Sequence, residues 1–284
     1  MALSLKTVET ARGARWIGDA FRLFVRKPLA FSMLFAVFLF GALMVSLLPF
    51  VGSMLQLMAL PLLSLGFMVA GQSVLLGGTA HPRQFIEPLR TDPKRRQTLL
   101  TLCLIYGLCA VAILVLADQV SNQAWERLQT LMAKGQPSPS QVDALLSEPG
   151  VATGLLLAAV LGSLLSVPFW HAPALVHWGG QTAGQALFSS TLALWRSKSA
   201  FLVYMLGWLA VIAGFAMVSA LIFNLLGLSQ LAGVLGLPAG LIFSTVFYLS
   251  VLFSFNDSFG VGLPPGDEPP APSLPSAPSA PTAP

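Results

Sequence analysis

The sequence predicts an all-α, polytopic membrane protein with six transmembrane helices. Of the 284 residues, 55% are apolar and only 9% are charged, whereas soluble domains carry about 25% charged residues. The apolar residues fall into six long blocks, and a run of roughly 18 or more such residues predicts a membrane-spanning helix. Every Asp, Glu, Lys and Arg lies outside these blocks. A soluble fold would need more charge to cover its surface.

Residues 1–28 are predicted to form a cytoplasmic amphipathic segment. Five apolar residues of this segment fall on one face of a helix: Trp16, Ile17, Ala20, Phe21 and Phe24. The charged residues lie elsewhere on the same helix. This pattern is typical of a helix that lies on the membrane with its apolar face toward lipid.

Residues 29–256 are predicted to form the transmembrane domain. Its six spans are expected at about 29–48, 51–76, 98–117, 153–176, 201–225 and 231–256. Short turns at 49–50 and 227–230 join the outer pairs of spans into hairpins. Similar basic and helical segments precede the first, third and fifth spans, which indicates three repeated hairpins with short interfacial helices. The repeats share one orientation, unlike the inverted repeats of many transporters.

The basic residues predict the orientation and a lipid partner. Of the 15 Lys and Arg residues, 13 precede the first span or lie in the loops after the second and fourth spans. Because cytoplasmic loops are enriched in Lys and Arg, both termini are expected in the cytoplasm. Cations at span ends suit anionic headgroups better than nucleic acid. The expected lipid contacts are Arg22, Arg26, Lys27, Lys94, Arg95, Arg96, Arg196 and Lys198.

The 118–152 loop is the one sizeable segment expected on the far side of the membrane. Apolar residues at helical spacing predict that it rests on the lipid as a cap, with a partner-binding surface as the alternative. The break at Pro137-Ser-Pro139 is expected to precede a second short helix that Ser140 caps.

Residues 257–284 are predicted to be a disordered cytoplasmic tail. From Gly262 onward this segment consists almost entirely of Pro, Ala, Ser and Gly, so it cannot bury a core.

A candidate polar site lies in the fourth span, at Pro168, Trp170, His171 and Pro173. Prolines inside a membrane helix bend it and free carbonyls that other groups must satisfy. His171 is either a pH-sensitive or ligand-contacting group, or a neutral imidazole bonded to a freed carbonyl; the second interpretation is favoured. A small-residue motif at Gly233, Gly236 and Gly240 of the last span predicts close helix packing, within the bundle rather than across a dimer.

The sequence predicts neither an enzyme nor a cofactor. The expected spans contain no carboxylate, which relays in proton-coupled transporters generally need. The cysteines and histidines lack the spacing of metal ligands. The expected function is that of a non-enzymatic scaffold or accessory subunit with a membrane-protein partner. The alternative is a transporter or channel for a neutral or amphiphilic, lipid-like solute.

Two stretches carry a family resemblance: Trp16–Pro28, which leads into the first span, and Phe169–Val176 in the fourth. They resemble an uncharacterised family of six-span bacterial inner-membrane proteins, found mainly in β-proteobacteria, over about residues 10–256. A more distant resemblance is to the membrane domain of glycerophosphodiester phosphodiesterases, whose catalytic domain this chain lacks. The resemblance implies a multi-pass location in the bacterial inner membrane, and no activity or site residues.

Overall fold

The six predicted spans are helices in a computed structural model, which describes residues 4–260 except 49–50, 91, 134, 136–137 and 228–231. Every regular element of these residues is helical, and six helices are long and apolar enough to cross a membrane. They are α2 (Pro28–Ser46), α3 (Gly52–Leu75), α5 (Pro93–Val120), α8 with α9 (Pro149–Phe169 and Ala172–Gly179), α11 (Lys198–Leu225) and α12 (Ala232–Phe259). The all-α polytopic class is therefore confirmed.

The remaining helices are short and precede or connect the spans. They are α1 (Arg12–Arg26), the 3-10 helix η1 (Pro82–Phe85), α4 (Glu87–Arg90), α6 (Ala124–Ala133), α7 (Pro139–Leu146) and α10 (Ala183–Arg196). α1, α4 and α10 lead directly into the spans α2, α5 and α11, respectively. Proline in the first turn starts two of these spans, at Pro28 and Pro93, where its missing N–H costs no helical hydrogen bond. Asp92 also caps α5 by accepting the Lys94 N–H at 2.9 Å.

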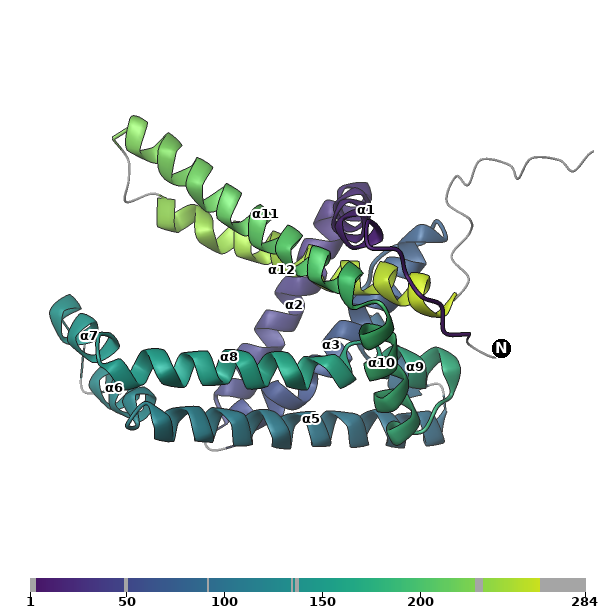
Figure 1. Cartoon of the computed structure of the whole chain (residues 1–284), viewed down its shortest axis with the longest axis horizontal. Helices are drawn as coiled ribbons and strands as arrows, with labels where there is room; N and C mark the ends of the chain where they lie inside the picture. The colour runs from purple at the N-terminus through teal and green to yellow at the C-terminus, as the bar shows by residue number, and fades with distance from the viewer. Residues whose placement is uncertain are drawn as a thin grey trace, which may run out of the picture.

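The spans form three hairpins that meet at one end of the molecule (Figure 1). The hairpins are α2 with α3, α5 with α8, and α11 with α12. In Figure 1, α11 and α12 rise away from α5 and α8, whereas α1, α9 and α10 gather where the hairpins meet. We call the end with α1, α9 and α10 the convergent end. The opposite end, with α6, α7 and the tip of the α11–α12 hairpin, is the divergent end.

The protein core lies at the convergent end. There α3 and α12 are central. Within the apolar membrane-spanning stretch of each of these two helices, 44% is buried inside the protein, whereas in α11 the buried share is 6%. Aromatic rings from several helices fill the space between them, and Phe67 of α3 stacks on Tyr248 of α12 with 5.6 Å between ring centroids. Lipid or another chain must therefore cover most of α11.

The N-terminal helix α1 packs on protein, so the prediction that its apolar face rests on lipid is wrong. Trp16 and Ala20 are completely buried, and α1 lies against α11 and α12. Its position is fixed by Asp257, which accepts hydrogen bonds from Arg12 Nε at 2.7 Å and from Trp16 Nε1 at 2.7 Å. The helix is amphipathic as predicted, but an apolar helical face can be covered by protein as well as by lipid.

Several predicted bounds shift by a few residues; α5, for example, begins at Pro93 and not at residue 98. α12 continues through Asp257 to Phe259, past the predicted end of the last span at residue 256. The helix α7 is capped by Ser138, whose hydroxyl accepts the Gln141 N–H at 3.3 Å, and not by Ser140. Ser138 takes this role because Pro139 occupies the first turn. The disordered tail was predicted from residue 257, but residues 257–259 are helical. Its part from 261 onward lies outside the described residues, as do the predicted turn at 49–50 and positions 228–230 of the other predicted turn.

Candidate functional site: the break in the fourth span

The fourth span is broken in two at the predicted site. α8 contains Pro168 and ends at Phe169, whereas α9 begins at Ala172 with Pro173 in its first turn. Trp170 and His171 form the link between the two helices. A proline within α8 removes one ladder hydrogen bond, and the second proline can only start a new helix. The two prolines thus produce the break that the sequence predicted.

Ser190 of α10 fills the gap in the hydrogen-bond ladder at this break. Its hydroxyl accepts the His171 N–H at 3.0 Å and donates to the Val167 carbonyl at 3.1 Å. In an intact α-helix these two backbone groups would bond directly. A side chain inserted into the ladder in this way is an established cause of helix bending. Ser190 therefore satisfies the backbone groups that the break exposes.

The imidazole of His171 is held by Ser254 of α12. Its Nε2 lies 3.0 Å from Ser254 Oγ, which also accepts the Trp170 Nε1–H at 3.3 Å. Ser254 donates its own proton to the Val251 carbonyl at 2.9 Å. The roles of donor and acceptor between Nε2 and Ser254 depend on the ring tautomer. The predicted bond from the imidazole to a freed carbonyl is wrong, because the partner of the ring is a serine hydroxyl.

The other ring nitrogen of His171 has no hydrogen-bond partner among the described residues, although the side chain is completely buried. Three phenylalanine rings surround it; those of Phe255 and Phe259 each lie 5.6 Å from the imidazole centroid, and that of Phe201 lies 6.1 Å away. Nδ1 is thus left for one further hydrogen bond, which water or a hydroxyl group could supply because each can both donate and accept.

Ser254 belongs to a row of small polar residues that the sequence analysis missed. Ser250, Ser254 and Ser258 recur every four residues on α12, and all three are buried. The hydroxyl of Tyr204 lies 2.7 Å from Ser250 Oγ, so the row joins α12 to α11 as well as to the fourth span. The signal was visible, because a spacing of four places side chains on one helical face. The spacing alone, however, does not show that these serines bond to residues of other helices.

The cations predicted to contact lipid all belong to the convergent end. Arg26, Lys27, Lys94, Arg96, Arg196 and Lys198 are exposed. Arg22 is also exposed, but it pairs with Asp19 at 3.0 Å. Arg95 instead donates to the carbonyl of His177 at 2.8 Å, at the carboxyl end of α9, where a positive charge is favourable. Six of the eight side chains are therefore exposed without an ion pair in the part of the chain that the structure describes, and the contact of all eight with lipid stays a prediction.

The glycine face of α12 is open. A Cβ atom placed on Gly236 or on Gly240 would meet no heavy atom of the described residues within 4 Å. The surroundings of Gly233 lie outside what the structure describes. The described helices thus supply no neighbour for this face, although packing within the bundle was the favoured expectation.

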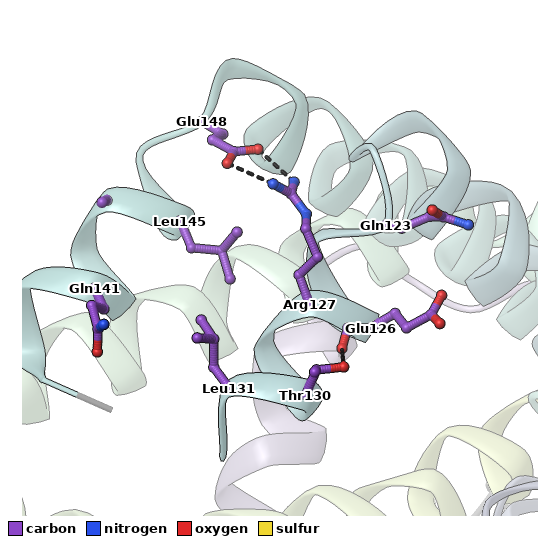
Figure 2. Close-up of a pocket in the computed structure, with 9 residues that line it drawn as sticks. Gln123, Glu126, Arg127, Thr130, Leu131, Gln141, Leu145 and Glu148 are labelled. Carbon is purple, nitrogen blue, oxygen red and sulfur yellow. Dashed lines mark hydrogen bonds and ion pairs between the residues drawn. The ribbon is translucent and has the colours of Figure 1, made fainter. Parts of the chain in front are cut away.

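The cap at the divergent end contains an open hollow of about 600 Å³ between α6 and α7. Figure 2 shows Leu131 and Leu145 on one side of it and the ion pair of Arg127 with Glu148 on another. The guanidinium of Arg127 donates to both carboxylate oxygens of Glu148, at 2.9 and 2.6 Å. These hydrogen bonds lower the pKa of Glu148. The apolar residues of this loop were expected to face lipid, but Leu131 packs inside the cap instead.

Similarity to a known protein supports the assignment of this chain to a membrane. The chain is 33% identical to a probable inner membrane protein of Burkholderia thailandensis, over 271 residues that cover 95% of this chain and 97% of that protein. The chain belongs to this family. No family model matches the chain, and no solved structure matches it.

Membership in the probable inner-membrane protein family agrees with the six apolar helices. The chain is thus an integral membrane protein, as the resemblance implied. The comparison shows no link to glycerophosphodiester phosphodiesterases, and that resemblance stays a prediction. Within the residues that the structure describes, no group of three His, Cys, Asp or Glu side chains could hold a metal ion.

Proposed function

We propose that the protein is a non-enzymatic scaffold or accessory subunit of the inner membrane that binds another membrane protein. The observation that carries this proposal is the uncovered half of the α11–α12 hairpin at the divergent end. Only 6% of the apolar membrane-spanning stretch of α11 is buried inside the protein. The face of α12 with Gly236 and Gly240 has no neighbour within 4 Å among the described residues.

Glycines on a membrane helix favour association for a physical reason. Lipid tails are as apolar as leucine, so burial of apolar surface does not bring helices together within the bilayer. Close backbone packing does, and small residues four positions apart permit it. Gly236 and Gly240 have this spacing and share one face of α12. A helix from a second protein can therefore approach this face closely.

The experiment is native mass spectrometry of the protein extracted gently from its own membrane. We expect a second polypeptide at a fixed stoichiometry, and we expect the variant Gly236→Leu/Gly240→Leu to lose it. Gly162→Leu is the matched control, because Gly162 of α8 is equally open and belongs to another hairpin. The control should keep the partner.

Three outcomes would overturn the proposal. A bare monomer from native membranes would show that lipid alone covers the hairpin. A partner retained by both leucine variants would show that the complex forms elsewhere. A mass of twice the chain would identify a second copy as the partner and remove the accessory-subunit role.

The break in the fourth span favours a second candidate function, transport of a neutral or amphiphilic solute. The buried Nδ1 of His171 has no hydrogen-bond partner among the described residues, and irregular backbone at membrane depth often lines a substrate path. Purified protein in vesicles should then move labelled lipid faster than empty vesicles, and His171→Leu should abolish the difference. Equal rates in protein-containing and empty vesicles would exclude lipid as the solute.

We also infer that both termini face the cytoplasm. The support is the concentration of Lys and Arg at the convergent end, where α1 and the end of α12 lie. A fluorescent reporter that folds only in the cytoplasm should be bright at either terminus. A dark fusion with an active periplasmic reporter at the same terminus would reverse the orientation.

A further inference from the structure

The helix α10 exposes aromatic side chains on the face opposite its packed face. Its buried residues are Ala186, Ser190 and Ala193. Phe188 and Trp195 are 69% and 72% exposed. At 100° per residue, these two aromatics share one side of the helix, about 180° from the buried residues. The packed face holds α10 in place, and the aromatic face is left uncovered by the described residues.

The position of α10 places this face at the membrane surface. α10 ends at Arg196, and the span α11 begins at Lys198 after a single connecting residue. In Figure 1, α10 runs across the ends of α5 and α8 and not along them. The carboxyl end of α10 therefore lies at the depth where a span enters the bilayer. Tryptophan is enriched at this depth, because its ring is apolar and its N–H is polar.

The charges beside the aromatic face have one sign. Arg196 and Lys198 are exposed, and the Lys198 Nζ lies 5.3 Å from the centroid of the Trp195 ring. The sequence contains no Asp or Glu between Glu148 and Asp257, so this segment supplies no acidic partner of its own. Two cations next to an exposed indole match a negatively charged, partly apolar surface.

We propose that Phe188, Trp195, Arg196 and Lys198 form an in-plane binding surface for anionic phospholipid at the convergent end. Phe188 and Trp195 insert among the upper acyl chains. Arg196 and Lys198 bind the phosphate groups above them. The proposal does not depend on the partner of the α11–α12 hairpin, because it uses other residues at the other end of the molecule.

The depth of Trp195 tests the first half of the proposal. The full chain is reconstituted in phosphatidylcholine vesicles with bromine either near the glycerol or near the chain ends, and the emission of Trp195→Phe is subtracted. We expect the Trp195 emission to be quenched several-fold more by shallow bromine than by deep bromine, and to be protected from aqueous iodide. The control is Trp208→Phe, because Trp208 is only 6% exposed and its emission should resist both.

Emission from Trp195 that iodide quenches and bromine does not would overturn the proposal, because the face would then lie in water. Emission that neither shallow nor deep bromine quenches, together with protection from iodide, would also overturn it, because protein would then cover the face.

The lipid that stays bound tests the second half. The protein is washed out of vesicles that contain phosphatidylglycerol and phosphatidylcholine in equal amounts, and the retained lipids are quantified by mass spectrometry. We expect enrichment of phosphatidylglycerol, reduced by roughly fivefold for each cation removed in Arg196→Gln/Lys198→Gln. The control Arg83→Gln/Arg90→Gln removes two exposed cations from η1 and α4 and should keep the enrichment. Equal enrichment in wild type and Arg196→Gln/Lys198→Gln would overturn the anionic preference.

Discussion

The two halves of α12 have opposite surroundings although both are apolar. At the convergent end, Val246, Leu249 and Phe255 are completely buried. At the divergent end, Leu235 and Ile242 are 43% and 36% exposed. The difference lies in the small polar residues, since the serine row occupies only the convergent half. The convergent half thus contains the contacts that determine the tertiary structure, and the divergent half presents a surface to lipid or a partner.

The largest difference in the free energy of unfolding should be between the replacement of a buried tryptophan and the replacement of an exposed one. Trp16 is completely buried, with its ring centroid 5.1 Å from that of Phe201. We expect Trp16→Ala to lower the free energy of unfolding by about 3–5 kcal/mol. The control Trp125→Ala, at a site 63% exposed, should cost about 0.5 kcal/mol or less. Equal SDS midpoints in mixed micelles would contradict the comparison.

The next effect should come from Asp257, which joins α1 to α12. Asp257→Ala leaves the Arg12 guanidinium and the Trp16 indole N–H without their acceptor. The Arg12 side chain is 32% exposed, so water compensates in part and we expect a loss of about 2 kcal/mol. Asp143→Ala at the exposed cap is the matched control. If Arg12→Ala and Asp257→Ala have additive effects, the pair is not coupled and the prediction fails.

A smaller effect should separate two serines of the same chemistry. Ser190 bridges the broken ladder at the convergent end, whereas Ser163 of α8 bonds only to the Ala159 carbonyl of its own helix at 2.7 Å. Hydrogen bonds between membrane helices contribute about 1 kcal/mol. Ser190→Ala should therefore cost about that amount and Ser163→Ala almost nothing. A larger cost for Ser163→Ala in the same SDS titration would contradict the assignment.

The smallest effect should be the acid sensitivity of the cap at the divergent end. Arg127 lowers the pKa of Glu148 in the folded protein through hydrogen bonds. Because the pKa of Glu148 is lower in the folded than in the unfolded protein, the ion pair stabilises the cap when the pH is above the unfolded-state pKa. This stabilisation is lost as the pH falls through the folded-state pKa. Amide exchange in α6 and α7, corrected for its intrinsic rate, should rise in acid for the wild type. Glu148→Gln should flatten that response, and an unchanged response would rule out the pair as its cause.

The spans could be predicted from the sequence because the length and apolar composition of a span belong to one continuous segment and do not depend on its neighbours. Each predicted window overlaps one of the six helices, including the interrupted fourth. The broken helix at Pro168 and Pro173 was predictable for the same reason, since proline acts on its own backbone.

The contacts between segments could not be predicted in this way. Asp257 lies 245 positions from Arg12, and nothing near either residue indicates the other. Likewise, the apolar face of α1 showed that something covers it but not whether lipid or protein does. The partner of His171 was missed because Ser254 becomes its neighbour only after α12 packs against the fourth span.

Ser190 connects a helix at the surface mechanically to the interior of the fourth span. Its hydroxyl keeps the His171 N–H apart from the Val167 carbonyl only while α10 stays against α8 and α9. Pro168 and Pro173 keep the fourth span bent in any case. Loss of α10 from this position would therefore leave two unpaired backbone groups inside the bilayer, where such groups are costly. The docking of a surface helix is thus tied to the hydrogen-bond balance of a membrane span.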